Sequence, residues 1–97
     1  MEKYIKQAIT EHQNGRLEKA EILYRNILKE NPNLHNVHSN LGHILLRFGK
    51  LEDAELSFKK AISIKPDYPE AHNNLGSLLQ QLKKLSEAEL CLSLIHI

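Results

Sequence analysis

The sequence has 97 residues, of which 26% are charged, and its formal net charge at neutral pH is +1. This near-neutral balance provides no basic footprint for nucleic acid or for an anionic membrane surface, so we expect neither as a partner. No run approaches the roughly 20 apolar residues of a membrane helix, and the single cysteine, Cys91, cannot form an internal disulfide, which favours a reducing compartment, the cytoplasm.

The first 34 residues predict two helices. The first covers about 2–13, where Tyr4, Ile5, Ala8 and Ile9 share one helical face. Asn14-Gly15 then supplies a residue that tolerates positive φ, which is a common helix stop. The second helix covers about 17–30 and ends at Asn31-Pro32, because proline disfavours helical geometry in the residue before it.

Residues 35–68 repeat this plan with the same spacing. A helix over about 34–48 is followed by Gly49, and a second helix over about 51–64 precedes Pro66. The apolar residues predicted on the second helix are Leu51, Ala54, Leu56, Phe58, Ala61 and Ile62.

A third copy begins at Pro69 and is less regular. The apolar residues of its first helix are Ala71, Leu75, Leu78, Leu79 and Leu82. Lys83 stands where the earlier copies have glycine, and a lysine in the left-handed conformation costs about 1 kcal/mol relative to glycine. We therefore expect a strained or differently shaped turn here, followed by a second helix with Leu85, Ala88 and Leu90.

Small residues recur where two helices have to approach closely: Ala8, Gly42 and Gly76 on first helices, and Ala20, Ala54 and Ala88 on second helices. The whole pattern predicts an all-α chain of about six helices in antiparallel pairs, divided into repeats over 1–34, 35–68 and a shortened 69–91.

At these positions the chain resembles the tetratricopeptide repeat (TPR) family. The second copy matches best, through Leu41-Gly42, Leu45, Ala54, Phe58, Ala61 and Pro66. The resemblance implies an α-solenoid that forms a right-handed superhelix. The stretch 15–28 also looks like the first repeat of bacterial proteins in which such arrays precede glycosyltransferase or sulfotransferase domains.

Members of this family bind extended peptides in a concave groove that is lined by the first helix of each repeat. By that mapping, the residues expected to face the groove are Asn36, Ser39, Asn40, His43, Arg47, Glu70, Asn73, Asn74, Ser77 and Gln81. Asn40 and Asn74 match asparagines that form a ladder on the peptide backbone in some members, because an amide offers both a donor and an acceptor. The matching residue of the first repeat is Lys6. Members that clamp a terminal carboxylate use several cations, and only Arg47 and Lys6 are available here.

The sequence contains no catalytic constellation, no phosphate-binding loop and no metal-ligand spacing, so we expect no catalytic residues, no metal and no cofactor. His38 and His72 lie one repeat apart, and we interpret them as packing residues of the helices.

The stretch 92–97, Leu-Ser-Leu-Ile-His-Ile, loses the polar face that a surface helix keeps. It resembles the translation of a transposon mosaic-end adaptor used in sequencing libraries, so we interpret it as an adaptor-derived tail. Codons that differ from the adaptor would refute this.

Two functions follow from the sequence. The first is a non-catalytic module that binds a protein or an extended peptide in its groove. The second is the substrate-recognition arm of a larger glycosyltransferase or sulfotransferase. We expect either a monomer or weak self-association through the open apolar end after Leu82.

Overall fold

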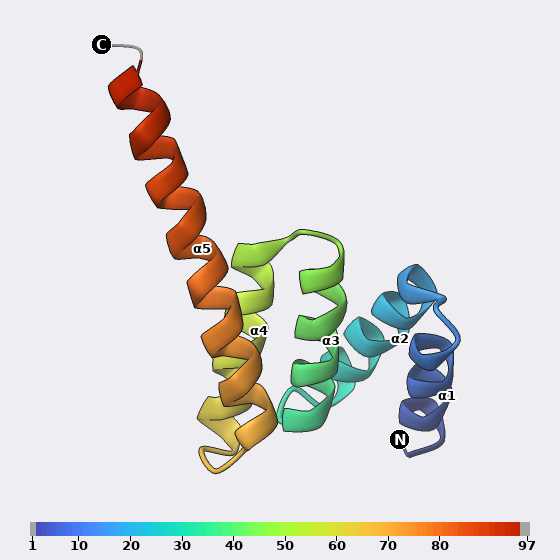
Figure 1. Ribbon diagram of the computed structural model, residues 1–97. Helices are drawn as coiled ribbons and strands as arrows, with labels where there is room; N and C mark the ends of the chain where they lie inside the picture. The colour runs from blue at the N-terminus through green and yellow to red at the C-terminus, as the bar shows by residue number, and fades with distance from the viewer. Residues whose placement is uncertain (1, 96–97) are drawn as a thin grey trace.

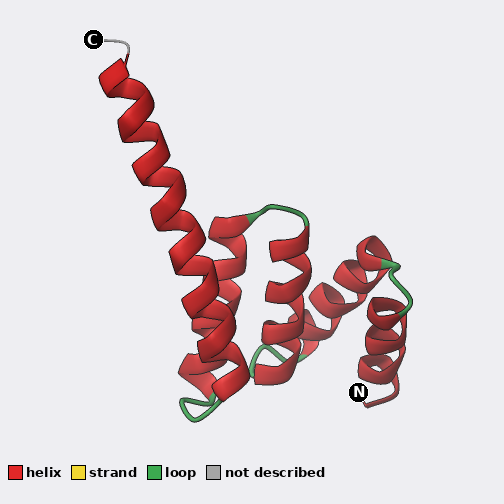
Figure 2. Ribbon diagram, in the orientation of Figure 1, coloured by secondary structure: helices red, strands yellow, loops and turns green. Residues whose placement is uncertain are grey.

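The computed structural model describes the backbone of residues 2–95 and the side chains of residues 2–86, and the described chain contains helices and loops only (Figure 1, Figure 2). The five helices are α1 (Glu2–Gln13), α2 (Leu17–Glu30), α3 (His35–Arg47), α4 (Leu51–Ile64) and α5 (Pro69–Ile95). Each helix packs on the next one in the chain, and α3 contacts α2, α4 and α5. This order of contacts is that of a helical solenoid, as predicted.

The two glycine stops have the conformation that the sequence predicts. Gly15 has φ +81° and Gly49 has φ +77°, so both lie in the left-handed region. The Arg16 N–H donates to the Glu11 carbonyl at 2.9 Å, and the Lys50 N–H donates to the Leu45 carbonyl, also at 2.9 Å. These bonds, together with the shorter-range bond from each glycine N–H, form Schellman motifs that satisfy the last carbonyls of α1 and α3.

The third repeat differs from the prediction, because the described residues contain five helices and no turn at Lys83. Instead α5 runs without interruption from Pro69 to Ile95 and extends away from the other helices (Figure 1). The physical reason is the missing glycine: a continued helix avoids the left-handed conformation that Lys83 would otherwise have to adopt. The side chains after Ser86, including those of Ala88 and Leu90, and the interpretation of 92–97 lie outside the described residues.

A close contact between α3 and α4 forms the centre of the core. A Cβ atom placed on Gly42 would lie 2.9–3.0 Å from atoms of the Phe58 ring, so the ring occupies the space that a side chain at 42 would need. Ala54 and Phe58 are fully buried, which confirms the predicted close approach. At Gly76, however, no described atom lies within 4 Å of the same position, so the corresponding prediction for Gly76 was wrong.

Several apolar residues that the pattern predicted on apolar faces are exposed: Tyr4, Leu56, Leu79 and Leu85. Leu56 is 66% exposed, because on a helix it points about 200° away from Ala54 and from Phe58, which define the buried face. Tyr4 is 57% exposed and lies at the outer edge of the α1–α2 contact, where it lines a shallow hollow with Leu23.

None of the described helices combines the length and the apolar character that crossing a lipid bilayer requires.

Candidate peptide-binding surface

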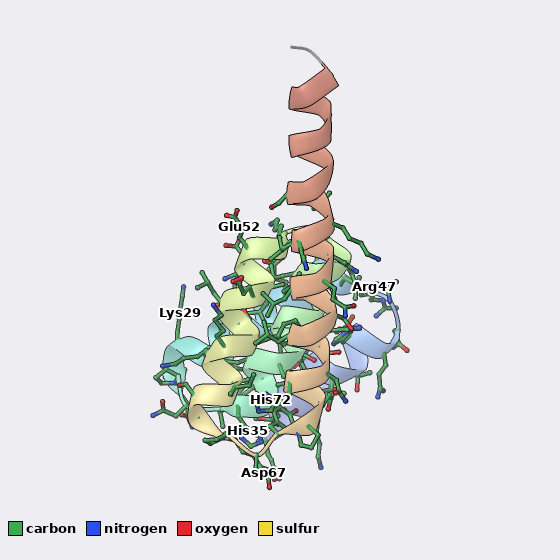
Figure 3. All side chains as sticks on the ribbon, turned by 60° about the vertical axis from the view of Figure 1, so that its left-hand side comes forward. Lys29, His35, Arg47, Glu52, Asp67 and His72 are labelled. Atoms are coloured by element: carbon green, nitrogen blue, oxygen red, sulfur yellow. The ribbon has the colours of Figure 1, made fainter. Side chains whose placement is uncertain are left out.

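The first and second helices of the repeats present opposite sides of the molecule. Figure 3 shows Arg47 of α3 on the side where α1 lies, and Lys29 of α2 and Glu52 of α4 on the other side. The resemblance to TPR proteins points to the Arg47 side, which we call the α1/α3 surface: it comprises the exposed and half-buried residues of these two helices on that side, together with the adjoining residues of α5.

A hydrogen-bonded cluster joins α1, α2 and α3 below this surface. The His12 ring, in the last turn of α1, has its Nδ1 atom 3.2 Å from the Tyr24 hydroxyl oxygen of α2. The His12 Nε2 atom lies 3.2 Å from Nδ1 of His43 on α3. Tyr24 is fully buried, whereas His12 and His43 are half-buried. The cluster therefore fixes the position of the first repeat relative to the second.

The environment of the cluster favours the neutral forms of His12 and Tyr24. Burial lowers the pKa of His12, and the nearby His43 and Arg47 act in the same direction. Burial also raises the pKa of Tyr24 to about 12, with the neighbouring Asn40 side chain acting the other way. If His12 and His43 were both doubly protonated, each would direct an N–H group at the other and the hydrogen bond between them would be lost.

This arrangement predicts that acidification weakens the fold. The pKa of His12 is lower in the folded protein than its usual value of 6.5, so the unfolded chain binds more protons between these two values. The contribution to stability is complete above pH 6.5 and is lost as the pH falls through the folded pKa. We expect the urea midpoint of unfolding to be lower at pH 5.5 than at pH 7.5, with a smaller decrease for His12→Gln.

His72→Gln is the matched control, because it changes a histidine that lies outside the cluster, and it should keep the full decrease. Equal decreases in the wild type and in His12→Gln would contradict the role of the cluster.

The predicted groove residues of α3 occupy different depths. Arg47 is exposed, and Asn36, Asn40 and His43 are half-buried. Ser39 is only 1% exposed, so it does not reach the accessible surface, contrary to its predicted placement in the groove. The reason is that α3 is the central helix, and α5 packs over part of it.

On α5, Asn74 is half-buried, and the other predicted residues are exposed: Glu70, Asn73, Ser77 and Gln81. Asn40 and Asn74 are thus both half-buried at equivalent positions of consecutive repeats.

Sequence reasoning missed His12 and Tyr24 as members of the cluster. In the 34-residue repeat, the position that corresponds to His12 in the second copy is Leu46, not His43. The periodicity therefore gave no indication that His12 and His43 are in contact.

His38 and His72 make identical contacts one repeat apart. Nε2 of His38 lies 2.7 Å from the Pro32 carbonyl oxygen, and Nε2 of His72 lies 2.8 Å from that of Pro66. Each histidine thus donates a hydrogen bond to the proline that follows the preceding helix. These two hydrogen bonds link successive repeats, and packing of the two rings against the helices stays a prediction. Among the described residues, no group of three or more potential metal ligands is close enough to hold a metal ion.

A separate hollow of about 430 Å³ lies on the Lys29 side, between α2, α3 and α4. It is lined by Arg25, Leu28, Lys29, His38, Leu41, Leu56, Ser57 and Lys60. Three cationic side chains, Arg25, Lys29 and Lys60, therefore line a hollow that is not on the α1/α3 surface.

Comparison with known proteins agrees with the fold and the repeat pattern. Residues 42–83 match a family model described as TPR repeat. Tetratricopeptide repeats therefore form this part of the chain. A search of the curated proteins gave no significant match.

Several solved structures are similar to this chain. The first TPR of Spaghetti (RPAP3), bound to the HSP90 peptide SRMEEVD, has a TM-score of 0.79 and 21% identity, and the match covers 82% of this chain and 64% of that chain. The type III secretion chaperone SycD of Yersinia enterocolitica, in complex with a peptide of the translocator YopD, has a TM-score of 0.81 and 20% identity, with 91% and 67% covered. MamA AMB-1 has a TM-score of 0.74 and 27% identity, with 84% and 44% covered. The chain thus spans less than two thirds of two of these three proteins.

Proposed function

We propose that these 97 residues are a non-catalytic interaction module that binds an extended peptide along the α1/α3 surface. The fold supports this proposal, because two similar structures, the TPR of Spaghetti and SycD, carry peptides. The single observation on which it depends is the pair Asn40 and Asn74, which are half-buried at equivalent positions of consecutive repeats. The cytoplasm, which the single cysteine favours, is the compartment that we propose.

The chemistry of the pair favours recognition of a peptide backbone. Each amide can donate to a main-chain carbonyl and accept from a main-chain N–H, so the contact does not depend on the peptide's side chains. Partial burial limits the motion of both side chains and reduces the entropy that binding would otherwise remove. Successive repeats then present equivalent amides along the surface, which suits an extended chain.

The experiment selects binders of the wild-type chain from a random dodecapeptide library and measures their dissociation constants. Replacement of both Asn40 and Asn74 by alanine should weaken binding by about tenfold or more, because each lost hydrogen bond contributes about 0.5–1.5 kcal/mol and 1.4 kcal/mol is tenfold. Asn26→Ala is the matched control, since Asn26 is an exposed asparagine on α2.

Unchanged binding by the double variant would refute the asparagine ladder. The peptide SRMEEVD is a useful comparison, because the paucity of cations on the α1/α3 surface predicts weak binding to its acidic terminus.

The alternative function is a recognition arm of a larger transferase. It is favoured by the likeness of residues 15–28 to repeats that precede such domains. A transferase domain encoded after Cys91 in the gene would support it, and further repeats alone would support the first proposal.

A further inference from the structure

The hollow on the Lys29 side lies between α2 and α4, on the side of the molecule opposite Arg47 (Figure 3). Both helices pack on α3, whereas the contact between α2 and α4 themselves is marginal at most, so the space above α3 stays open. The volume of the hollow is about 430 Å³, and α2, α3 and α4 all contribute lining residues. The stacking of consecutive repeats therefore forms a second surface, which the proposed function does not use.

Three leucines, one from each helix, give the hollow an apolar lining. Leu41 of α3 is 4% exposed and Leu28 of α2 is half-buried, so these two side chains belong to the packed structure. Leu56 of α4 is 66% exposed. A single exposed leucine is ordinary, but Leu56 lies beside two other leucines of the same hollow. Together the three leucines form an apolar surface that a bound side chain can cover.

Cationic side chains surround this apolar surface, and none of the described residues that line it is acidic. Arg25 donates to Glu21 at 3.0 Å, so its charge is already paired. Lys29 and Lys60 are exposed, and neither forms an ion pair with a described carboxylate. The dipole of α2 favours a cation such as Lys29 in the last turn, but Lys60 lies before the last turn of α4. The hollow therefore has cations that the fold leaves without a charged partner.

The repeat pattern does not require these two lysines. One repeat later, Ser63 stands at the position of Lys29, and one repeat earlier, Asn26 stands at the position of Lys60. The two lysines come from different helices and from different positions of the repeat, and they meet at one hollow. They are thus a property of this particular repeat boundary.

We propose that this hollow is a second binding site, which holds a short acidic segment of a partner protein with aliphatic side chains between its carboxylates. The aliphatic side chains cover Leu28 and Leu56, and the carboxylates pair with Lys29 and Lys60. The leucines favour such a peptide over an inorganic anion or a nucleic-acid backbone, because neither of these would remove Leu56 from water. The inference does not rest on the proposed function, since it concerns the opposite side of the molecule.

The probe for the charged contacts is the capped peptide acetyl-EDLLDE-amide, whose binding to the wild-type chain is followed by NMR of the backbone amides. We expect the largest shifts in α2 and α4 beside the hollow. Lys29→Glu combined with Lys60→Glu should weaken binding by about tenfold or more, because repulsion replaces two attractions. The matched control is Lys83→Glu combined with Lys84→Glu, which makes the same change in net charge at two exposed lysines of α5 and should keep the binding.

All four lysines are exposed, so circular dichroism should show retained helix in both double variants. Raising the salt concentration from about 0.01 M to about 0.15 M should also weaken binding, since the screening length falls from about 30 Å to about 8 Å. Absence of binding by the wild type up to millimolar concentrations would overturn the proposal. Equal losses in the two double variants would also overturn it, because they would indicate attraction to the net charge alone.

A second peptide tests the apolar contact. Acetyl-EDSSDE-amide keeps every carboxylate and should bind about fivefold or more weakly than the leucine peptide, since no aliphatic surface leaves water on binding. Leu56→Ser should reduce this preference for the leucine peptide. Leu79→Ser, at an exposed leucine of α5 outside the hollow, should preserve it. Equal binding of the two peptides to the wild type would overturn the proposed site.

The two binding surfaces can be tested separately. The variant with alanine at both Asn40 and Asn74 changes only the α1/α3 surface and should bind acetyl-EDLLDE-amide as tightly as the wild type. The double lysine variant at Lys29 and Lys60 should keep its affinity for library peptides that depend on the two asparagines. Loss of acetyl-EDLLDE-amide binding in the asparagine variant, with full binding by the lysine variant, would assign the peptide to the α1/α3 surface and overturn this inference.

Discussion

Gly42→Leu should destabilise the protein by about 3 kcal/mol or more, at the upper end of the effects of overpacking. The Cβ atom alone would come within 2.9–3.0 Å of the Phe58 ring, and the remaining leucine atoms have to displace that ring from a fully buried site. The gain in helix propensity on replacing glycine is at most about 1 kcal/mol, so it does not offset the clash. Urea unfolding followed by circular dichroism measures the loss.

Gly76→Leu is the matched variant, because it makes the same chemical change one repeat later. No described atom lies within 4 Å of its Cβ position, so the gain in helix propensity should leave the protomer as stable as the wild type or slightly more stable. Similar losses in both variants would show that the contact with Phe58 does not determine the tolerance at position 42.

Phe58→Ala should destabilise the protein by about 3–5 kcal/mol, the usual range for removing a buried aromatic side chain. The ring is fully buried and fills the space beside Gly42, so its removal leaves a cavity between α3 and α4. Because small domains are stable by only about 5–15 kcal/mol, this variant should be largely unfolded at moderate urea concentrations.

Leu56→Ala, two residues earlier on the same helix, is the control for helix propensity and surface area. Leu56 is 66% exposed, so its loss should change stability by no more than about 0.5 kcal/mol. A loss for Phe58→Ala that is no greater than this would mean that the Gly42–Phe58 contact is not the centre of the core.

Local sequence signals were sufficient for most of the fold. The predicted limits of α1, α2 and α4 coincide with the observed ones, and α3 differs by one residue at each end. Glycine and proline set these limits through backbone geometry, which neighbouring repeats do not alter. The third repeat was not predictable in the same way, because at Lys83 the choice between a turn and a continued helix depends on what else contacts α5.

The candidate site was less accessible to sequence reasoning than the fold. The repeat mapping taken from the resemblance to TPR proteins predicts Asn40 and Asn74 as groove residues, which stays a prediction. It could not identify the pair formed by His12 and His43, since this contact joins different positions of adjacent repeats. The same mapping placed Ser39 on the surface, although Ser39 is buried. A mapping based on one repeat does not show which residues of α3 are covered by the helix of the next repeat, α5.

The paired contacts of His38 with Pro32 and of His72 with Pro66 have a consequence for cooperativity. Each contact crosses a repeat boundary, so unfolding one repeat removes a hydrogen bond from the start of its neighbour. In a one-dimensional array, such boundary interactions make partly unfolded states unfavourable relative to the fully folded and fully unfolded ones. The same two bonds add to the helix packing at each boundary, so they contribute to the angle between successive repeats.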